Sequence, residues 1–250
     1  MISITISGEY DEEKVIRSCK THTDMTFFYP GERGFSIDGT SGQLHGDFDI
    51  LKRILSERAG HTRVTLVTDD GRLYLAFPSY LYDFIEDTRA RAIHHKIEGS
   101  GYVYRECVWR RSIRLREYDG LFSHAVDEGG TAAFDVALGR LLSPVDLAVG
   151  HREKYERYIE RCAFAVLCYI LNLDIANDGA SDRTADPYPW QPIQALSLMT
   201  ERMLIDRETV DAILPGCNTP SLSEAAAMLL AYEKKHWGKQ RAQAMVPDML

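Results

Sequence analysis

Apolar and polar residues alternate at the start of the chain, where isoleucines at positions 2, 4 and 6 are separated by serine and threonine. Alternation at period two predicts a strand with one buried face. The same reasoning predicts a second strand over 25–29 and two strands within 64–77. Asp69-Asp70-Gly71 separates those two strands, and Asp-Gly favours the positive φ angles of a tight hairpin turn.

Apolar residues at helical spacing predict two helices in the same half of the chain, over 11–20 and 47–58, the second capped by Asp47. A third helix is predicted to start at Pro78-Ser79 and to end near His94-His95. Its inner stripe would consist of Leu81, Phe84, Ile85 and Thr88. The glycine-rich segment 31–46 lacks lysine and matches neither phosphate-loop fingerprint, so we interpret it as turns around a short hairpin.

Beyond Gly129-Gly130 the pattern becomes helical. A helix is predicted over 131–142, another starting at Ser143-Pro144, and a long one over 151–173 that is apolar all round from Cys162 onward. Further helices are predicted over 193–204, after Asp206, and over 222–239 behind a capping box at Ser221 and Glu224.

Strands and helices are therefore segregated along the chain. We expect an α+β fold in which a strand-rich N-terminal part carries antiparallel hairpins and three helices, followed by an all-helical C-terminal part. The expected domains are residues 1–128, an α+β domain, and residues 129–250, a helical domain. Segregation argues against a doubly wound parallel sheet.

Composition supports a folded globular protein, with 45% apolar and 26% charged residues and a net charge of −8. The five cysteines form no CxxC pair, which disfavours a disulfide scaffold or a cysteine-rich zinc site. The N-terminus lacks the pattern of a signal peptide, and the longest apolar run, 163–171, is too short to span a bilayer. We expect a soluble, cytoplasmic protein with no membrane partner and no cofactor or metal.

Charge is distributed unevenly, since residues 89–116 contain eight bases and two acids. The stretch Tyr102–Arg116 alternates from Cys107 onward, which predicts a strand with Trp109, Ile113 and Leu115 inward. The opposite face would project Arg110, Arg114 and Arg116, about 7 Å apart per two-residue step, close to the phosphate spacing of a nucleic-acid strand. The candidate nucleic-acid or phosphate-binding residues are Lys96, Tyr102, Tyr104, Arg105, Arg110, Arg114 and Arg116.

Other patterns are weaker. His94-His95 suggests a metal or acid–base site, although histidines also favour the negative end of a helix. The acidic segment 174–186 has oxygen donors at several positions of a calcium loop but lacks the glutamate at the twelfth. Ser41 near His45 is the closest approach to a hydrolase element, and turn chemistry explains it as well. We find no catalytic residue set in the sequence.

The leading functional hypothesis is a non-catalytic component of a larger assembly that binds nucleic acid (RNA or DNA) or phosphate through the arginine-rich strand. The main alternative is a protein–protein adaptor or inhibitor whose acidic helical surface meets a protein partner. A second alternative is a hydrolase or nuclease with a site between the two parts. An acidic net charge counts against a generic nucleic-acid coating protein.

Overall fold

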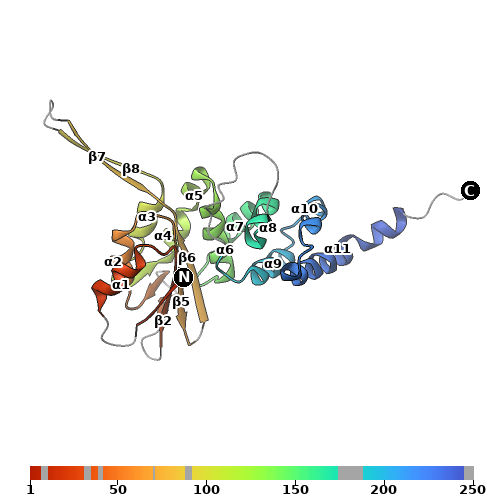
Figure 1. Cartoon of the computed structure of the whole chain (residues 1–250), viewed down its shortest axis with the longest axis horizontal. Coiled ribbons are helices and arrows are strands. Elements are labelled where there is room, and N and C mark those ends of the chain that lie inside the picture. Colours follow the sequence, from red (N-terminus) through yellow and green to blue (C-terminus); the bar gives the residue numbers. More distant parts are fainter. Residues whose placement is uncertain are drawn as a thin grey trace, which may run out of the picture. The chain divides into compact units, whose positions relative to one another are not determined.

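The computed structural model describes residues 1–6, 11–30, 35–38, 42–69, 71–87, 92–173 and 188–244. The described chain forms two compact units, Met1–Lys154 and Tyr155–Leu250, which are considered separately here (Figure 1). All strands of the described residues belong to the first unit, and the second is helical. The expected α+β class is therefore confirmed.

A four-stranded sheet of order β1-β2-β5-β6 forms the centre of the first unit. Its strands are β1 (Ile2–Thr5), β2 (Asp24–Tyr29), β5 (Thr62–Thr68) and β6 (Gly71–Phe77). The expected hairpin is confirmed, because β5 and β6 pair antiparallel from Thr62↔Phe77 to Thr68↔Gly71. The pairs β1–β2 and β2–β5 are parallel, so the sheet is mixed. Parallel neighbours need a crossover, and helices provide it here.

Two of the expected N-terminal helices make these crossovers. In α1 (Glu12–Cys19), Asp11 caps the helix by accepting from the Lys14 amide at 3.1 Å. Helix α2 (Asp49–Glu57) buries its apolar stripe but begins one residue later than a cap at Asp47 would imply. Phe48 is its N-cap, without a side-chain capping bond, and the predicted cap Asp47 lies 3.4 Å from the Asp49 amide.

The expected third helix is wrong. Residues 81–98 form a two-stranded antiparallel ribbon of β7 (Leu81–Asp87) and β8 (Ala92–Glu98), which extends away from the sheet of its unit (Figure 1). The register places Tyr82 opposite Ile97 and Asp83 opposite Lys96, an apolar pair and an opposite-charge pair. Such cross-strand pairs favour a ribbon, and they involve residues too distant in sequence to enter a helical pattern. We call this ribbon the arm.

The expected strand over 107–116 is also mostly wrong. It is reduced to β9 (Ser112–Arg114), which lies between α3 (Gly101–Glu106) and α4 (Leu115–Gly120). Strand β9 completes a second sheet of order β3-β4-β9, with β3 (Ser36–Asp38) and β4 (Gln43–His45). The antiparallel pairing of β3 with β4 confirms the short hairpin expected in the glycine-rich segment.

Helices α5 (Phe122–Glu128) and α6 (Thr131–Leu142) are joined by Gly129 and Gly130, both at φ +72°. That φ favours glycine, so two consecutive glycines permit the abrupt change of direction. Helix α6 packs on β6, and Ser143 at its C-cap accepts from the Tyr74 amide at 2.9 Å. This packing groups α6 with the sheet of the first unit.

A buried ion pair fixes α6 to α4. The Arg140 guanidinium donates to both carboxylate oxygens of Asp119 at 2.7 and 3.0 Å, and also to the carbonyls of Ser143 and Val145. Both side chains are fully buried. Removing one member of such a pair leaves an uncompensated charge in the interior.

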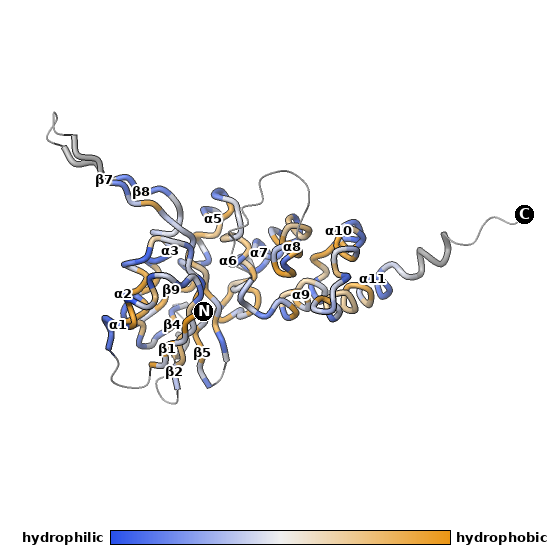
Figure 2. The backbone as a smooth tube through the Cα atoms, viewed as in Figure 1, coloured by the Kyte–Doolittle hydropathy of each residue, from blue (hydrophilic) through white to orange (hydrophobic). Residues whose placement is uncertain are grey.

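The second unit consists of helices. Helix α7 (Val149–Arg161) begins in the first unit, and it is followed by α8 (Ala163–Leu171), α9 (Pro192–Glu201), α10 (Arg207–Ile213) and α11 (Ser223–Ala244). Figure 2 shows the apolar character of α8, and the predicted single helix 151–173 is interrupted at Cys162. Asp206 caps α10 as expected, by accepting from the Thr209 amide at 2.7 Å. The expected helix at Ser143-Pro144 does not form.

The start of α11 also differs from expectation. The 3-10 turn Pro220–Leu222 precedes the helix, and Ser221 bonds the Thr219 hydroxyl at 3.0 Å. No helix within the described residues has the length and apolarity needed to cross a membrane.

Replacing Asp119 with alanine should destabilise the protein by about 3–5 kcal/mol, because Arg140 would remain buried without its carboxylate. Urea unfolding measures the change. Glu57→Ala, which breaks the exposed Lys20–Glu57 pair, is the control and should cost less than about 1 kcal/mol. The double variant Asp119→Leu/Arg140→Met should recover part of the loss. Equal losses for Asp119→Ala and Glu57→Ala would contradict this account.

Candidate functional site

Arg105, a candidate phosphate ligand by sequence, is buried and serves the fold. Its guanidinium donates to four backbone carbonyls at 2.6–2.9 Å, those of Arg58, Gly60, Pro78 and Gly101. Its guanidinium carbon also lies 4.9 Å from the ring centroid of Tyr80. Burial lowers the pKa of Arg105 to about 10. Because the donors already have protein acceptors, this arginine does not face an external ligand.

Tyr104, a candidate for base stacking, belongs to the core as well. Its ring meets Tyr118 edge-on at 4.9 Å, and both rings are fully buried. The Tyr118 hydroxyl accepts from the Ala76 amide at 3.0 Å and donates to the Ala76 carbonyl at 2.7 Å. Burial raises the pKa of Tyr104 and raises that of the neighbouring Cys107 thiol to about 12. Cys107 is therefore a protonated core thiol, unsuited to act as a nucleophile.

Trp109 was expected inside and is instead 57% exposed. The chain reverses at this point, with the Trp109 amide donating to the Ser112 carbonyl at 2.7 Å and Val108 bridged to Ile113. Reversal places Val108 and Ile113 in the core and turns the indole outward. Arg114 lies over the indole, 5.2 Å from the ring centroid. The expected burial of Ile113 and Leu115 is confirmed.

Residues 109–112 form what we call the arginine turn. Arg110 and Arg111 are 78% and 80% exposed at the side chain, and contact Asp49 at 3.2 Å and Asp47 at 3.7 Å. Surface ion pairs of this kind contribute little and exchange readily with other partners. Around the turn, four bases each form an ion pair with one of four acids. The pairs are Lys52–Glu106, Arg110–Asp49, Arg111–Asp47 and Arg114–Glu117.

The remaining arginines of the predicted strand also contact protein groups. Arg114 bonds Glu117 at 2.7 Å and donates to the Glu106 carbonyl at 2.6 Å. Arg116 contacts Asp146 at 3.2 Å. The projecting row of Arg110, Arg114 and Arg116 therefore becomes three separate contacts, because only Ser112–Arg114 is a strand.

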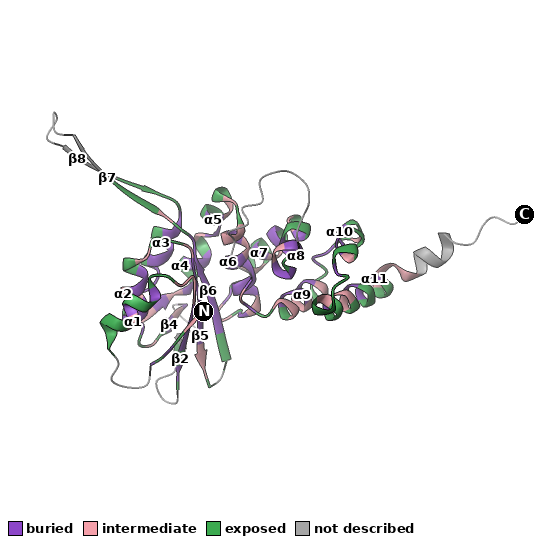
Figure 3. Ribbon diagram, viewed as in Figure 1, coloured by how far each residue is buried: buried purple, intermediate pink, exposed green. Residues whose placement is uncertain are grey.

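Exposed apolar side chains are concentrated in one part of the sequence, which comprises the arm and the elements that follow it. Of the twelve large apolar side chains that are exposed among the described residues, six lie between positions 81 and 109. These six are Leu81 (68%), Tyr82 (55%), Ile97 (42%), Tyr102 (40%), Val103 (40%) and Trp109 (57%). We call them the 81–109 surface, and Figure 3 shows the exposed root of the arm. Sequence reasoning missed Leu81, Tyr82 and Ile97, although the β-branched and aromatic content of 81–98 signalled a strand.

The other sequence candidates do not come together. Lys96 lies on β8 and bonds Glu98 beside it. His94 and His95 belong to β8 rather than to a helix end. The acidic segment 174–186 and Ser41 lie outside the described residues. Within the described part, no three histidine, cysteine or acidic side chains are arranged to hold a metal ion.

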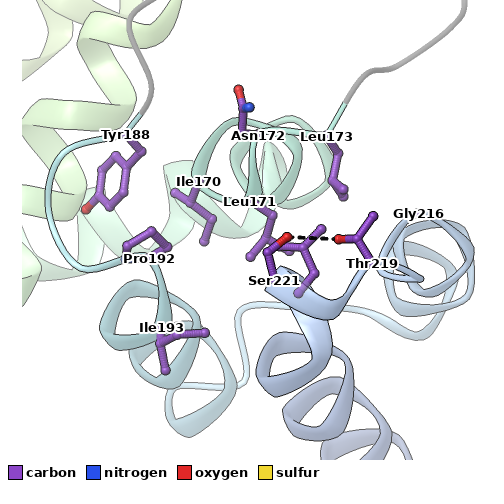
Figure 4. A pocket seen from close by; sticks show the side chains of 11 residues that line it. Ile170, Leu171, Asn172, Leu173, Tyr188, Pro192, Ile193, Gly216, Thr219 and Ser221 are labelled. Atoms are coloured by element: carbon purple, nitrogen blue, oxygen red, sulfur yellow. Dashed lines mark hydrogen bonds between the residues drawn. The ribbon is translucent and has the colours of Figure 1, made fainter.

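The second unit contains a half-open cavity of about 580 Å³ (Figure 4). Aliphatic side chains such as Ile170, Leu171 and Ile193 form much of its lining, and the Thr219 and Ser221 hydroxyls bond each other at its edge. Among the described residues, the lining contains no carboxylate, imidazole, thiol or amine side chain. These lining residues therefore supply apolar contact area but no general acid or base at neutral pH.

Comparisons with protein-family models, with curated proteins and with solved structures each found no match to this chain.

Replacing Arg105 with lysine should destabilise the protein by at least about 3 kcal/mol. The lysine ammonium has three donors at a single nitrogen, so it cannot bond all four carbonyls that the guanidinium reaches through three nitrogens. Denaturant unfolding is the measurement. Arg110→Lys is the matched control, and its exposed side chain predicts a change below about 0.5 kcal/mol. A loss at Arg105 no larger than that at Arg110 would show that the buried contacts are dispensable.

Proposed function

We propose that this protein is a non-catalytic component of a larger protein assembly, and that the 81–109 surface is where a protein partner docks. One observation carries the proposal: half of the exposed large apolar side chains in the described residues lie within 29 consecutive positions. Concentrated apolar exposure marks interaction sites, whereas single exposed apolar residues are ordinary.

The architecture of the arm supports the proposal. A two-stranded ribbon in water is marginally stable by itself, because neither face packs on a core. In the described residues the arm pairs with no third strand, and Leu81, Tyr82 and Ile97 are exposed at its root. A partner that covers these side chains would bury apolar area that is now exposed.

The composition of the surface also fits a protein partner. Tryptophan, tyrosine and arginine are the residues most often found as binding hot spots. Trp109 is exposed beside Arg110 and Arg111, and Tyr102 packs edge-on against Tyr80 at 5.7 Å. The four bases around the arginine turn are balanced by four acids. A balanced surface favours a protein partner over a polyanion, which needs excess positive charge.

Nucleic-acid or phosphate binding remains the second candidate, in a narrower form. Arg105 and Tyr104 are core residues, so they do not support it. Arg110 and Arg111 are exposed next to an exposed indole, which offers two cations and one stacking face. The hydrolase or nuclease hypothesis has no comparable support, since the described lining of the cavity in the second unit holds no acid–base pair.

Docking through the 81–109 surface predicts that Val103→Asp/Trp109→Ala reduces partner capture at least about tenfold, because a desolvated apolar contact is replaced by a charge. Tagged chain is cross-linked in cells that naturally make the protein, and captured proteins are quantified by mass spectrometry. Val149→Asp, another exposed helical valine of the first unit, is the control and should leave capture unchanged. Equal capture by wild type and Val103→Asp/Trp109→Ala would refute the proposed surface.

The nucleic-acid candidate predicts binding to generic single-stranded RNA or DNA that weakens as salt rises. The slope of log affinity against log salt is negative for such binding. Arg110→Glu/Arg111→Glu should make it less steep by about 1.4, because two phosphate contacts are lost. Lys20→Glu is the control. Lys20 is an exposed base outside the arginine turn and pairs with Glu57, so its replacement should leave the slope unchanged. No binding at low salt would eliminate this candidate.

A further inference from the structure

The outer edges of the arm provide a second observation about its partner. Within the described part of the chain, β8 pairs only with β7, and β7 only with β8. An outer strand edge presents backbone N–H and C=O groups to which a further strand can add. The two edges differ in sequence, so they differ in the strand that each accepts.

The sequence of β8 carries one apolar pair placed symmetrically about its centre. It reads Ala-Ile-His-His-Lys-Ile-Glu from 92 to 98, with Ile93 and Ile97 equally far from His95. Antiparallel pairing of β8 with a second β8 about His95 places Ile93 opposite Ile97 twice. Directly opposed β-branched residues stabilise a strand pair.

Other registers are less favourable. Residues on one face of a sheet recur every second position, so registers that preserve the faces differ by steps of two. The neighbouring register on one side places Ile93 opposite His95, and the one on the other side places Ile97 opposite His95. The register centred on His95 also pairs all seven residues of the strand.

The sequence of β7 opposes the same kind of pairing. It reads Leu-Tyr-Asp-Phe-Ile-Glu-Asp from 81 to 87, with three carboxylates and no base. Self-pairing about Phe84 would place Tyr82 opposite Glu86 and Leu81 opposite Asp87. Charged residues along an edge are a common means by which proteins prevent strand addition.

We infer that two copies of this chain associate through β8, forming one four-stranded sheet of order β7-β8-β8-β7 across a twofold axis. The inference rests on the proposed function and names the partner of the arm, a second copy of the chain. The contact is isologous, so it closes at a dimer and leaves the acidic β7 edges outermost.

The pairing brings basic positions together and so depends on pH. His95 falls opposite His95 on the axis, and His94 opposite Lys96. Imidazoles are neutral above about pH 6.5 and charged below it, and like charges directly opposite destabilise a strand pair. Lys96 is bonded by Glu98, which offsets its charge. Within one arm, the residues of β7 in register with His94, His95 and Lys96 are Ile85, Phe84 and Asp83, respectively.

Analytical ultracentrifugation of the purified full chain over a micromolar concentration series tests the inference. Wild type should show a monomer–dimer equilibrium at about pH 8 that weakens at about pH 5.5. Ile97→Lys should raise the dissociation constant at least about tenfold. Tyr82→Lys is the matched control, because Tyr82 is opposite Ile97 within the arm but lies on β7, and it should change the constant less than about threefold. Equal effects of the two variants would overturn edge pairing.

Disulfide trapping tests the register directly. Opposed residues in an antiparallel pair have Cα atoms about 4.5–5.5 Å apart, within disulfide range, so His95→Cys should cross-link to itself under mild oxidation. His94→Cys should not, because its copies are offset by two residues along the strands. The unmodified chain controls for the native cysteines, four of which are buried. Equal trapping at positions 94 and 95 would overturn the register.

The outcomes separate this inference from the proposed function. A monomeric wild type that still captures a different protein, with loss in Val103→Asp/Trp109→Ala, would overturn the dimer and leave the docking surface intact. A monomeric wild type that captures nothing would overturn both.

Discussion

The guanidinium of Arg105 joins the chain segments that lie next to the root of the arm and the start of α3. Its four acceptors lie at the end of α2, at the end of β6 and at the start of α3. A buried guanidinium is tolerated only when its donors are bonded, and buried carbonyls need donors in turn. Gly101 reflects how closely these segments meet, since a Cβ there would lie 2.0 Å from the Pro78 carbonyl oxygen. Arg105 therefore helps to fix the root of the arm, together with the backbone hydrogen bonds from Tyr80 to Ala59 and from Gly101 to Ser79.

Other polar side chains of the first unit also join elements in the interior. Arg140 joins α6 to Asp119 on α4. Asp135 on α6 accepts from His61 at 2.8 Å and lies 3.6 Å from Arg63 on β5, which in turn bonds Asp24 on β2. Each contact satisfies a charge that the fold has removed from water, so these groups define how helices sit on the sheet. The charged groups of Arg63, Asp119, Asp135 and Arg140 are consequently absent from the surface of the protein.

This division between internal and surface groups changes the meaning of the basic segment. In sequence, residues 89–116 carry an excess of six positive charges. In the structure Arg105 enters the core, and Arg110, Arg111, Arg114 and Arg116 each lie beside a carboxylate from another part of the first unit or from the next turn. Among the described residues, which do not include Arg89 and Arg91, the excess of charge in the sequence thus becomes a nearly balanced surface around an exposed tryptophan. Such a surface favours a protein partner over a phosphate chain. The arm beside it supplies apolar area and strand edges that pair with no third strand among the described residues.

The sequence by itself determined the features that depend on neighbouring residues. The Asp-Gly turn between β5 and β6, the cap at Asp206 and the helix α6 follow from local pattern, and all are confirmed. Only the tertiary structure decided the features that depend on distant partners. The spacing of Leu81, Phe84 and Ile85 fits a helix, and pairing with 92–98 made it a strand. Alternation in the sequence predicted Trp109 in the core. In the structure the chain reverses between Trp109 and Ser112, and this reversal exposes the indole. The acceptors of Arg105 lie up to 47 positions away, so no local pattern could distinguish a core arginine from a ligand-binding one.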